Sequence, residues 1–247
     1  MFIVAGGAGY LGSHIIEELL RNNYSVLCLS SRKSSITDKN LLSIEVDLLD
    51  EKEISNSLSS ISKGSSKVFE GIVNAAGRSK RKNDSEHSFS KSWDSLSDDA
   101  SLDPKILWNL AKYMLLRNMN FCPNSNFVDI GSIWAHRIPY SPLYLDLGNE
   151  PDLSVVLGKS CKRTLVRFLA KDFGEKSFTI NQVSPGWFPK PSGNPRPDYI
   201  NGITNRIPLN RIGSPRDLLP VLITILTNRP SYSNGSEYII DGGFDIY

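Results

Sequence analysis

The stretch Gly6-Gly7-Ala8-Gly9-Tyr10-Leu11-Gly12 follows the apolar run Phe2–Ala5 and opens Tyr10–Arg21, whose apolar residues recur at helical spacing. Glycines at every third position allow a tight turn, close approach of the backbone to a pyrophosphate and close packing of a helix on a sheet. A phosphate at this helix start meets free N–H groups and a favourable dipole. The stretch therefore predicts a strand, a phosphate-binding turn and a helix, with these contact residues: Gly6, Ala8, Gly9, Tyr10, Leu11 and Gly12.

Short apolar runs alternate with segments of helical period along the chain, which is typical of βα units on a parallel sheet. We expect strands at Phe2–Ala5, Ser25–Leu29, Leu42–Val46, Gly71–Asn74, Asn126–Ile130, Thr179–Val183 and Glu237–Ile240. We expect helices at Tyr10–Arg21, Lys105–Asn118, Gly158–Phe173 and Pro215–Thr227. No internal repeat or Gly/Ser linker divides the sequence. The pattern predicts one α/β domain, a doubly wound parallel sheet of about seven strands with helices on both faces.

The composition limits the class of protein and of partner. Of 247 residues, 40% are hydrophobic and 22% charged, which excludes disordered and fibrous classes. The formal net charge of +2 is too small for a dedicated nucleic-acid binder, so we expect a small-molecule partner. Cys28, Cys122 and Cys161 show no disulfide or zinc spacing. Because no signal peptide or membrane span is evident, we expect a cytoplasmic protein without a metal site.

The end of the second expected strand, Leu29-Ser30-Ser31-Arg32-Lys33, bears on which dinucleotide is bound. NAD-specific sites place an acidic residue here for the ribose hydroxyls, whereas a 2′-phosphate needs room, hydroxyls and a cation. Ser30 stands at the acidic position, and Ser31 and Arg32 follow it. A plain basic surface turn is the alternative interpretation. The residues favour NADP, with NAD kept open.

Further motifs follow in order along the chain. They are Val46-Asp47-Leu48, Asn74-Ala75-Ala76-Gly77, the segment Asn181–Gly186 with its Pro-Gly turn, Ile207-Pro208-Leu209 and Asp241-Gly242-Gly243. Together with the glycine turn, these motifs resemble the short-chain dehydrogenase/reductase family over nearly the whole chain. The glycine spacing resembles the extended branch of that family, whereas the length and the C-terminal motif resemble its shorter branch.

The resemblance implies a single NAD(P)-binding Rossmann domain over residues 1–247, an oxidoreductase activity on a hydroxyl or keto carbon, and assembly into homodimers or homotetramers. Beyond the glycine turn, the expected cofactor contacts are Ser30, Ser31, Arg32, Asp47, Leu48, Asn74, Ala75, Ala76, Gly77, Lys159, Pro185, Gly186, Trp187 and Phe188.

The resemblance also assigns catalytic roles. Ser132 corresponds to the family serine that polarises the carbonyl or alcohol, and Lys159 to the lysine that holds the ribose and lowers the pKa of a tyrosine. A phenol with a pKa of about 10 needs a nearby ammonium before it can act as a base at neutral pH. Val155 stands four residues before Lys159, where the family has that tyrosine, and Val cannot carry a proton.

A replacement for the tyrosine must come from elsewhere. The segment before Lys159 is longer than is usual in the family, which predicts an extended loop over 133–157. Tyr144 lies 12 residues after the serine, close to the family spacing, so we assign it the proton transfer. Tyr140 and His136 stay open as alternatives, His136 because its unperturbed pKa lies near working pH.

The expected substrate loop spans 187–207. Aromatic and cationic side chains in this loop and in the extended loop suit a small polar or anionic substrate. The asparagine of the family's proton relay falls near Ala100 or Ser101, neither of which can replace the amide. Because a fold does not fix a reaction, a catalytically silent nucleotide-binding protein and a lyase or dehydratase are the alternative functions.

Overall fold

A computed structural model describes residues 1–62, 68–77, 92–115, 119–139, 152–176, 178–190, 197–229 and 231–246. The strands are β1 (Phe2–Ala5), β2 (Val26–Ser30), β3 (Leu41–Glu45), β4 (Phe69–Asn74), β5 (Phe121–Ile130), β6 (Thr179–Pro185) and β7 (Glu237–Ile240). The helices are α1 (Tyr10–Arg21), α2 (Glu51–Ser62), α3 (Trp93–Leu115), α4 (Leu153–Gly174), α5 (Pro197–Thr204) and α6 (Pro215–Thr227). Short 3-10 turns span Ile133–Ala135 and Phe244–Ile246.

The strands form one seven-stranded parallel sheet in the order β3-β2-β1-β4-β5-β6-β7. The winding therefore reverses between β1 and β4, which in open parallel sheets is where ligands bind, beyond the carboxyl ends of the strands. The predicted doubly wound α/β fold is confirmed.

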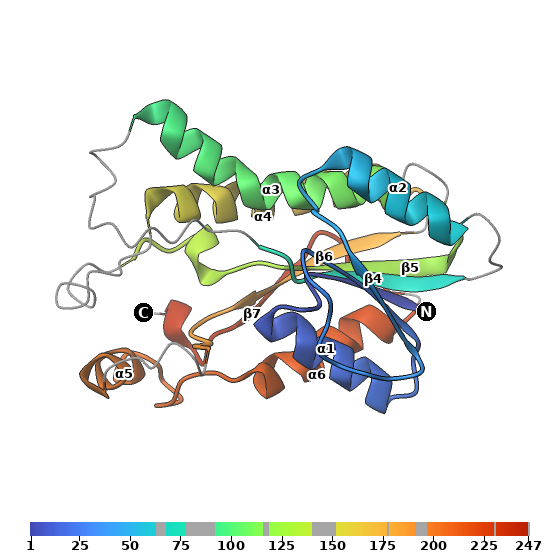
Figure 1. Cartoon of the computed structure of the whole chain (residues 1–247). Coiled ribbons are helices and arrows are strands. Elements are labelled where there is room, and N and C mark those ends of the chain that lie inside the picture. The colour runs from blue at the N-terminus through green and yellow to red at the C-terminus, as the bar shows by residue number, and fades with distance from the viewer. Residues whose placement is uncertain are drawn as a thin grey trace.

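Helices cover both faces of the sheet (Figure 1): α2, α3 and α4 lie on one face, and α1 and α6 on the other. Ile3 and Ala5 of β1 belong to the first core, and Phe2 and Val4 to the second, because side chains alternate along a strand. All four are fully buried, which explains why β1 is a continuous apolar run. Because helices bury both faces of the sheet, we expect a ligand to bind at its edge.

The two helices that frame the site are longer than predicted. α3 begins at Trp93 and runs through Pro104, so the prediction of a helix starting at Lys105 is wrong at that end. A proline inside a helix removes one hydrogen bond to the carbonyl four residues earlier, and packing of α3 against α4 and the sheet outweighs this loss.

The start of α4 corrects the length of the expected extended loop. Asp152 caps this helix, its carboxylate accepting from the Ser154 N–H at 2.8 Å. Residues 153–157 are therefore helical, and the loop expected over 133–157 is wrong at its end. The first residues of the expected loop, Ile133–Ala135, form a 3-10 turn. The helices α2 and α5 were not predicted.

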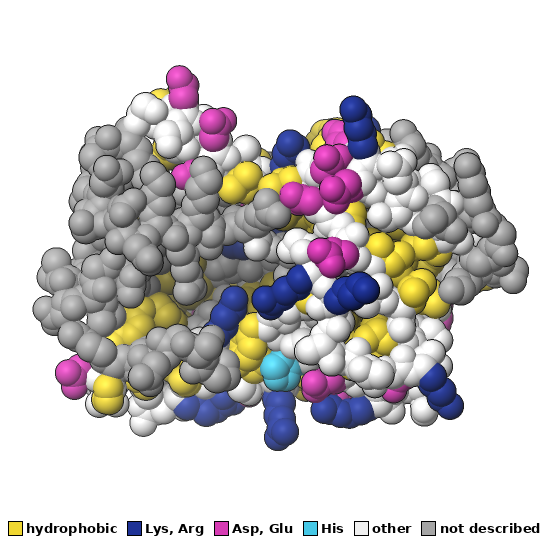
Figure 2. Space-filling model, viewed as in Figure 1, with side chains coloured by type: hydrophobic (Ala, Val, Ile, Leu, Met, Phe, Trp, Pro, Cys, Tyr) yellow, Lys and Arg dark blue, Asp and Glu magenta, His cyan; other side chains and the backbone are white. Residues whose placement is uncertain are grey.

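Charged side chains of both signs mix on the surface. On the face in Figure 2, Lys and Arg side chains lie beside Asp and Glu side chains. Among the described residues of this face, charges of both signs are therefore interspersed. Within the described ranges, no helix is long and apolar enough to cross a bilayer.

Candidate active site

The glycine turn joins β1 to α1 at the carboxyl edge of the sheet. Gly6 has a φ of 74°, which a residue with a side chain rarely adopts, and a Cβ there would lie 2.5 Å from the Ala76 backbone. A Cβ on Gly12 would lie 2.3 Å from the Gly6 carbonyl oxygen. Helix α1 starts after Gly9 with no side-chain cap and no acidic residue in its first turn. Its first N–H groups are therefore available to an anion such as a pyrophosphate.

Arg32 reaches from the end of β2 to the glycine turn, where its Nη2 donates to the Ala8 carbonyl oxygen at 2.9 Å. Ser30 is buried and Ser31 is exposed. A polar cavity of about 630 Å³ lies beside Ser31, and its other lining residues are Glu45, Val46, Asp47, Glu53, Asn56 and Ser57. The region thus has a cation against the phosphate-binding turn and carboxylates farther along β3 and α2.

A buried charged network lies beneath the ends of β4, β5 and β6. The Asp129 carboxylate accepts from Asn74 at 2.7 Å and from Gln182 at 2.9 Å, and Lys162 Nζ lies 3.1 Å from it. Lys162 also donates to the Ile130 carbonyl oxygen at 3.0 Å. Burial raises the pKa of Asp129, and the charge of Lys162 opposes that rise. The network holds the end of β5 two residues before the predicted catalytic serine.

Ser132 follows β5 and caps the short 3-10 turn. Its Oγ accepts a hydrogen bond from the Trp134 N–H at 3.2 Å. Ser160 of α4 donates to the Ala135 carbonyl oxygen at 2.8 Å. Because Ser160 follows Lys159 directly, this bond ties the helical turn that carries the predicted lysine to the turn that carries the serine.

Lys159 forms an ion pair with Asp103 of α3, its Nζ donating to the carboxylate. The lysine side chain is 20% exposed and the aspartate side chain 9%. Val155, one helical turn earlier, is half-buried and supplies no polar group. The sequence prediction missed Asp103, because the family resemblance directed attention to Ala100. Asp103 directly precedes Pro104, and the predicted helix began only at Lys105. An acidic residue at this position was the one signal in the sequence that could have pointed to a partner for Lys159.

The three candidates for proton transfer have different outcomes. Tyr140 and Tyr144 lie outside the described residues, so their assignment stays a prediction. The ring of His136 faces two carboxylates: Nδ1 lies 3.7 Å from Glu237 Oε1, and Nε2 lies 3.4 Å from Asp245 Oδ2. These contacts direct the imidazole toward β7 and the C-terminal turn, and the choice of proton donor stays a prediction.

Three aromatic side chains from separate segments meet beside the serine turn. Trp187, which follows β6, makes edge-to-face contacts with Tyr199 of α5 at 5.3 Å between ring centroids and with Trp134 at 6.5 Å. The Trp187 carbonyl oxygen accepts from the Gly213 N–H at 2.8 Å, which anchors the segment. The described part of the expected substrate loop, 187–207, therefore contributes an aromatic wall and contains α5.

Three other predicted contact residues lie close to this edge of the sheet. The Leu48 side chain belongs to the core, so it presents its backbone to the edge of the sheet. Asp47 Oδ1 accepts from the Leu49 N–H at 3.0 Å. Gly186, after Pro185, approaches β7 so closely that a Cβ would lie 2.7 Å from Asp241. These residues shape the edge of the sheet around the two turns.

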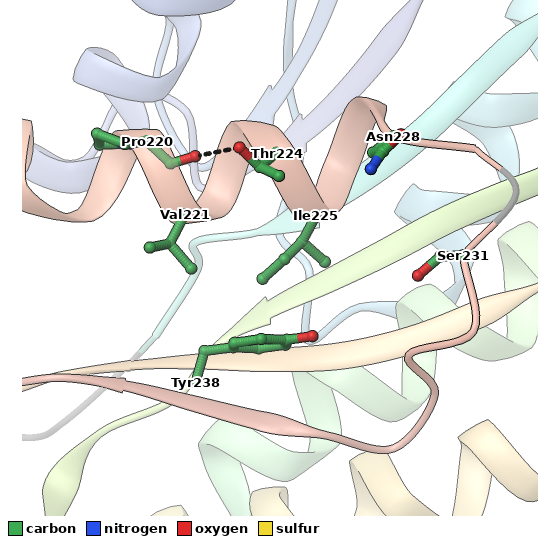
Figure 3. Close-up of a pocket in the computed structure, with 7 residues that line it drawn as sticks. All are labelled: Pro220, Val221, Thr224, Ile225, Asn228, Ser231 and Tyr238. Atoms are coloured by element: carbon green, nitrogen blue, oxygen red, sulfur yellow. Dashed lines mark hydrogen bonds between the residues drawn. The ribbon is translucent and has the colours of Figure 1, made fainter.

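A cavity of about 500 Å³ lies between α6 and β7 and contains none of the predicted site residues (Figure 3). Val221 and Ile225 from α6 and Tyr238 from β7 border it. The Thr224 hydroxyl donates to the Pro220 carbonyl oxygen within the helix at 2.7 Å. Among the described residues, no group of three His, Cys, Asp or Glu side chains could hold a metal ion.

Two family models match separate parts of the chain. One, Enoyl-(Acyl carrier protein) reductase, matches residues 149–245, and the other, NAD dependent epimerase/dehydratase family, matches residues 2–94. An uncharacterized oxidoreductase, YmfI, from Bacillus subtilis is 23% identical over 259 residues, 98% of this chain and 97% of the relative. The 3-oxoacyl-[acyl-carrier-protein] reductase FabG from Buchnera aphidicola is 22% identical over 98% of this chain and 95% of the relative. Some other curated relatives match over smaller parts, two of them over 29% and 36% of their own length.

These matches support the resemblance of the chain to the short-chain dehydrogenase/reductase family. A structure of a short-chain dehydrogenase from Leptospira borgpetersenii with bound NAD+ superposes with a TM-score of 0.85 at 21% identity, covering 98% of this chain and 91% of that one. The structure of ElxO with NADP bound gives a TM-score of 0.79 at 19% identity, covering 100% and 98%. Along this chain, one family model spans the glycine turn through β4, and the other spans α4 through β7.

Proposed function

We propose that this chain is an NADP(H)-dependent oxidoreductase that interconverts a hydroxyl and a keto carbon of a small polar or anionic substrate. One observation carries the proposal: the glycine turn, the Asn74–Gly77 turn and Ser132 follow the neighbouring strands β1, β4 and β5, and Ser160 ties the helix of Lys159 to the same edge. Relatives named as oxidoreductases and neighbours with bound NAD+ and NADP support it.

The residues at this edge suit a nicotinamide dinucleotide. The uncapped start of α1 would hold the pyrophosphate, and Arg32 would hold the 2′-phosphate because its guanidinium already lies on the turn. Lys159 would donate to ribose hydroxyls. When bound, the nicotinamide supplies the hydride for reduction or accepts it in oxidation.

The chain must supply a polarising group and a proton. The Ser132 hydroxyl donates to the substrate oxygen and stabilises the negative charge that develops there during reduction. The proton that completes the alcohol comes from a side chain, and we assign it to the Tyr144 phenol, which regains a proton from water. In the oxidative direction the same groups act in reverse. The aromatic wall at Trp134 and Trp187 would exclude water from this oxygen.

Direct binding measurements test the cofactor assignment. Wild-type protein is titrated with NADPH and NADH while nucleotide fluorescence is followed, beside Arg32→Ala and the control Arg21→Ala, which lies at the far end of α1. We expect Arg32→Ala to weaken NADPH binding by about tenfold or more and to change NADH binding by less than about twofold, because only NADPH carries the 2′-phosphate. Equal affinity of the wild type for the two nucleotides would contradict the NADP preference.

Turnover tests the proton donor. Oxidation of NADPH by a panel of carbonyl substrates is followed by absorbance for wild type, Ser132→Ala, Tyr144→Phe and Tyr140→Phe. We expect Ser132→Ala and Tyr144→Phe each to lower kcat by about 100-fold, and Tyr140→Phe to leave it nearly unchanged. Full turnover by Tyr144→Phe would exclude Tyr144. Nucleotide binding without turnover on any substrate would favour the silent or non-redox alternatives.

A further inference from the structure

The Lys159 ammonium has a charged partner that was not predicted from the sequence. Asp103 lies on α3, 56 positions from Lys159, and accepts a hydrogen bond from its Nζ. Both side chains are largely buried. A buried charge is costly unless it is paired and hydrogen-bonded, so the contact between these two groups offsets part of the cost of their burial.

This ion pair lies next to the expected nucleotide site. A Cβ on Gly77 would lie 3.2 Å from Asp103 Oδ1, which places the carboxylate against the turn that follows β4. The same turn packs on the glycine turn, since a Cβ on Gly6 would lie 2.5 Å from Ala76. Asp103 therefore joins three parts of the edge: the turn after β4, the phosphate-binding turn through Ala76, and Lys159.

Close contact between two helices produces this arrangement. A Cβ on Gly158 would lie 2.7 Å from the Ala100 carbonyl oxygen, so α3 and α4 approach closely one residue before Lys159. Pro104 has no N–H to donate to that carbonyl, which is its usual partner in a helix. Asp103 stands between these two residues on α3, and the close approach brings its short side chain within reach of the lysine.

We propose that Asp103 is a positioning residue that holds Lys159 for binding of a nicotinamide ribose, so that nucleotide affinity depends on Asp103 through Lys159. The inference rests on the proposed function. A lysine side chain is flexible, and a fixed carboxylate restricts it to one arrangement before ligand arrives. An ammonium has three N–H donors, so one bond to Asp103 leaves donors for the vicinal hydroxyls of a ribose. The Val155 side chain has no hydroxyl, so it cannot hold the Lys159 ammonium in place of Asp103.

A double-mutant cycle in nucleotide binding tests the inference. The dissociation constant for NADPH is measured by fluorescence titration for wild type, Asp103→Asn, Lys159→Met and the double variant. Asp98→Asn, an exposed acid on the same helix, is the matched control. We expect Asp103→Asn to weaken binding by about fivefold or more in the wild-type background and by less than about twofold in the Lys159→Met background. Asp103→Glu, which keeps the carboxylate, should recover part of the loss.

The outcomes separate this inference from the proposed function. Wild-type protein that binds neither NADPH nor NADH would overturn both. Wild-type protein that binds NADPH, with Asp103→Asn unchanged or with equal losses in both backgrounds, would overturn only the role of Asp103. Circular dichroism melts check that each variant is folded. If Asp103→Asn melts below the assay temperature, Asp103→Ser takes its place in the same cycle, because it removes the charge in a smaller volume.

Discussion

Asp129 and Lys162 are both fully buried, and their charges lie 3.1 Å apart beneath the edge of the sheet that carries the candidate site. Neither charge can reach water, so their stability depends on each other and on the amide donors of Asn74 and Gln182. The pair holds the end of β5 through the Ile130 carbonyl oxygen. This buried charged network therefore supports the end of β5, two residues before Ser132.

Removal of one member of this pair should strongly destabilise the fold. We expect Lys162→Met to lower the free energy of unfolding by about 3–5 kcal/mol, because it leaves the Asp129 charge buried without its partner. Chemical denaturation in urea measures the change. Asp129→Asn combined with Lys162→Met should recover about half of the loss. Lys171→Met is the control, and we expect it to change the free energy of unfolding very little because Lys171 is exposed. An effect of Lys162→Met as small as that of the control would contradict the role of the buried pair.

Asp217 at the start of α6 predicts a pH dependence of stability. The Arg211 guanidinium holds the pKa of this carboxyl well below its usual range, and the N–H and hydroxyl of Ser214 add to the effect. A carboxyl whose pKa is lower in the folded state contributes stability above its unfolded pKa of about 3.9, and loses it as the pH falls toward the folded pKa.

Asp217→Asn tests this dependence. We expect it to cost about 1 kcal/mol at pH 7, a small value because Arg211 is 54% exposed and water screens the pair. Urea denaturation from pH 7 to pH 3 should show that the difference from wild type is constant down to about pH 5 and shrinks below about pH 4. A difference that stays constant to pH 3 would contradict a lowered pKa.

At the scale of elements, the approach of α3 to α4 depends on Gly158. A Cβ there would meet the Ala100 backbone at 2.7 Å, and backbone on two packed helices cannot move aside locally. The cost of separating the helices exceeds the gain in helix propensity of about 1 kcal/mol that Ala offers over Gly.

Gly158→Ala should therefore lower the free energy of unfolding by about 1–3 kcal/mol, measured by thermal or urea denaturation. Gly174→Ala at the other end of α4 is a matched control. A Cβ there would meet the Asn234 side-chain amide at 3.2 Å and no backbone atom, so we expect a smaller loss than at Gly158. Stabilisation by Gly158→Ala would show that the two helices are not held this closely.

At the scale of the whole molecule, exposed aromatic side chains on α3 and α4 bear on assembly. Trp108 is 45% exposed and Phe168 is 50% exposed, on helices that cover the same face of the sheet (Figure 1). Large aromatic groups on adjacent surface helices are typical of protein interfaces.

We expect the protein to form a homodimer or homotetramer through this face. Sedimentation velocity should show an oligomer for wild type and a smaller species for Trp108→Glu combined with Phe168→Glu, because buried carboxylates oppose association. Tyr232→Glu is the control, since that side chain is fully exposed on a different segment. A wild-type protein that sediments as a monomer at micromolar concentration would contradict the expectation.

The alternation of strands and helices, the glycine turn, and the positions of Ser132 after a strand and Lys159 on a helix were predictable from the sequence. Apolar period and glycine spacing depend on residues within a few positions of each other, so they can be read along the chain. Three features were not predictable from the sequence: α3 continues through Pro104, His136 faces the C-terminal turn, and Asp103 pairs with Lys159. These features arise where helices pack across a sheet and bring distant side chains into low-dielectric contact, which no local pattern encodes.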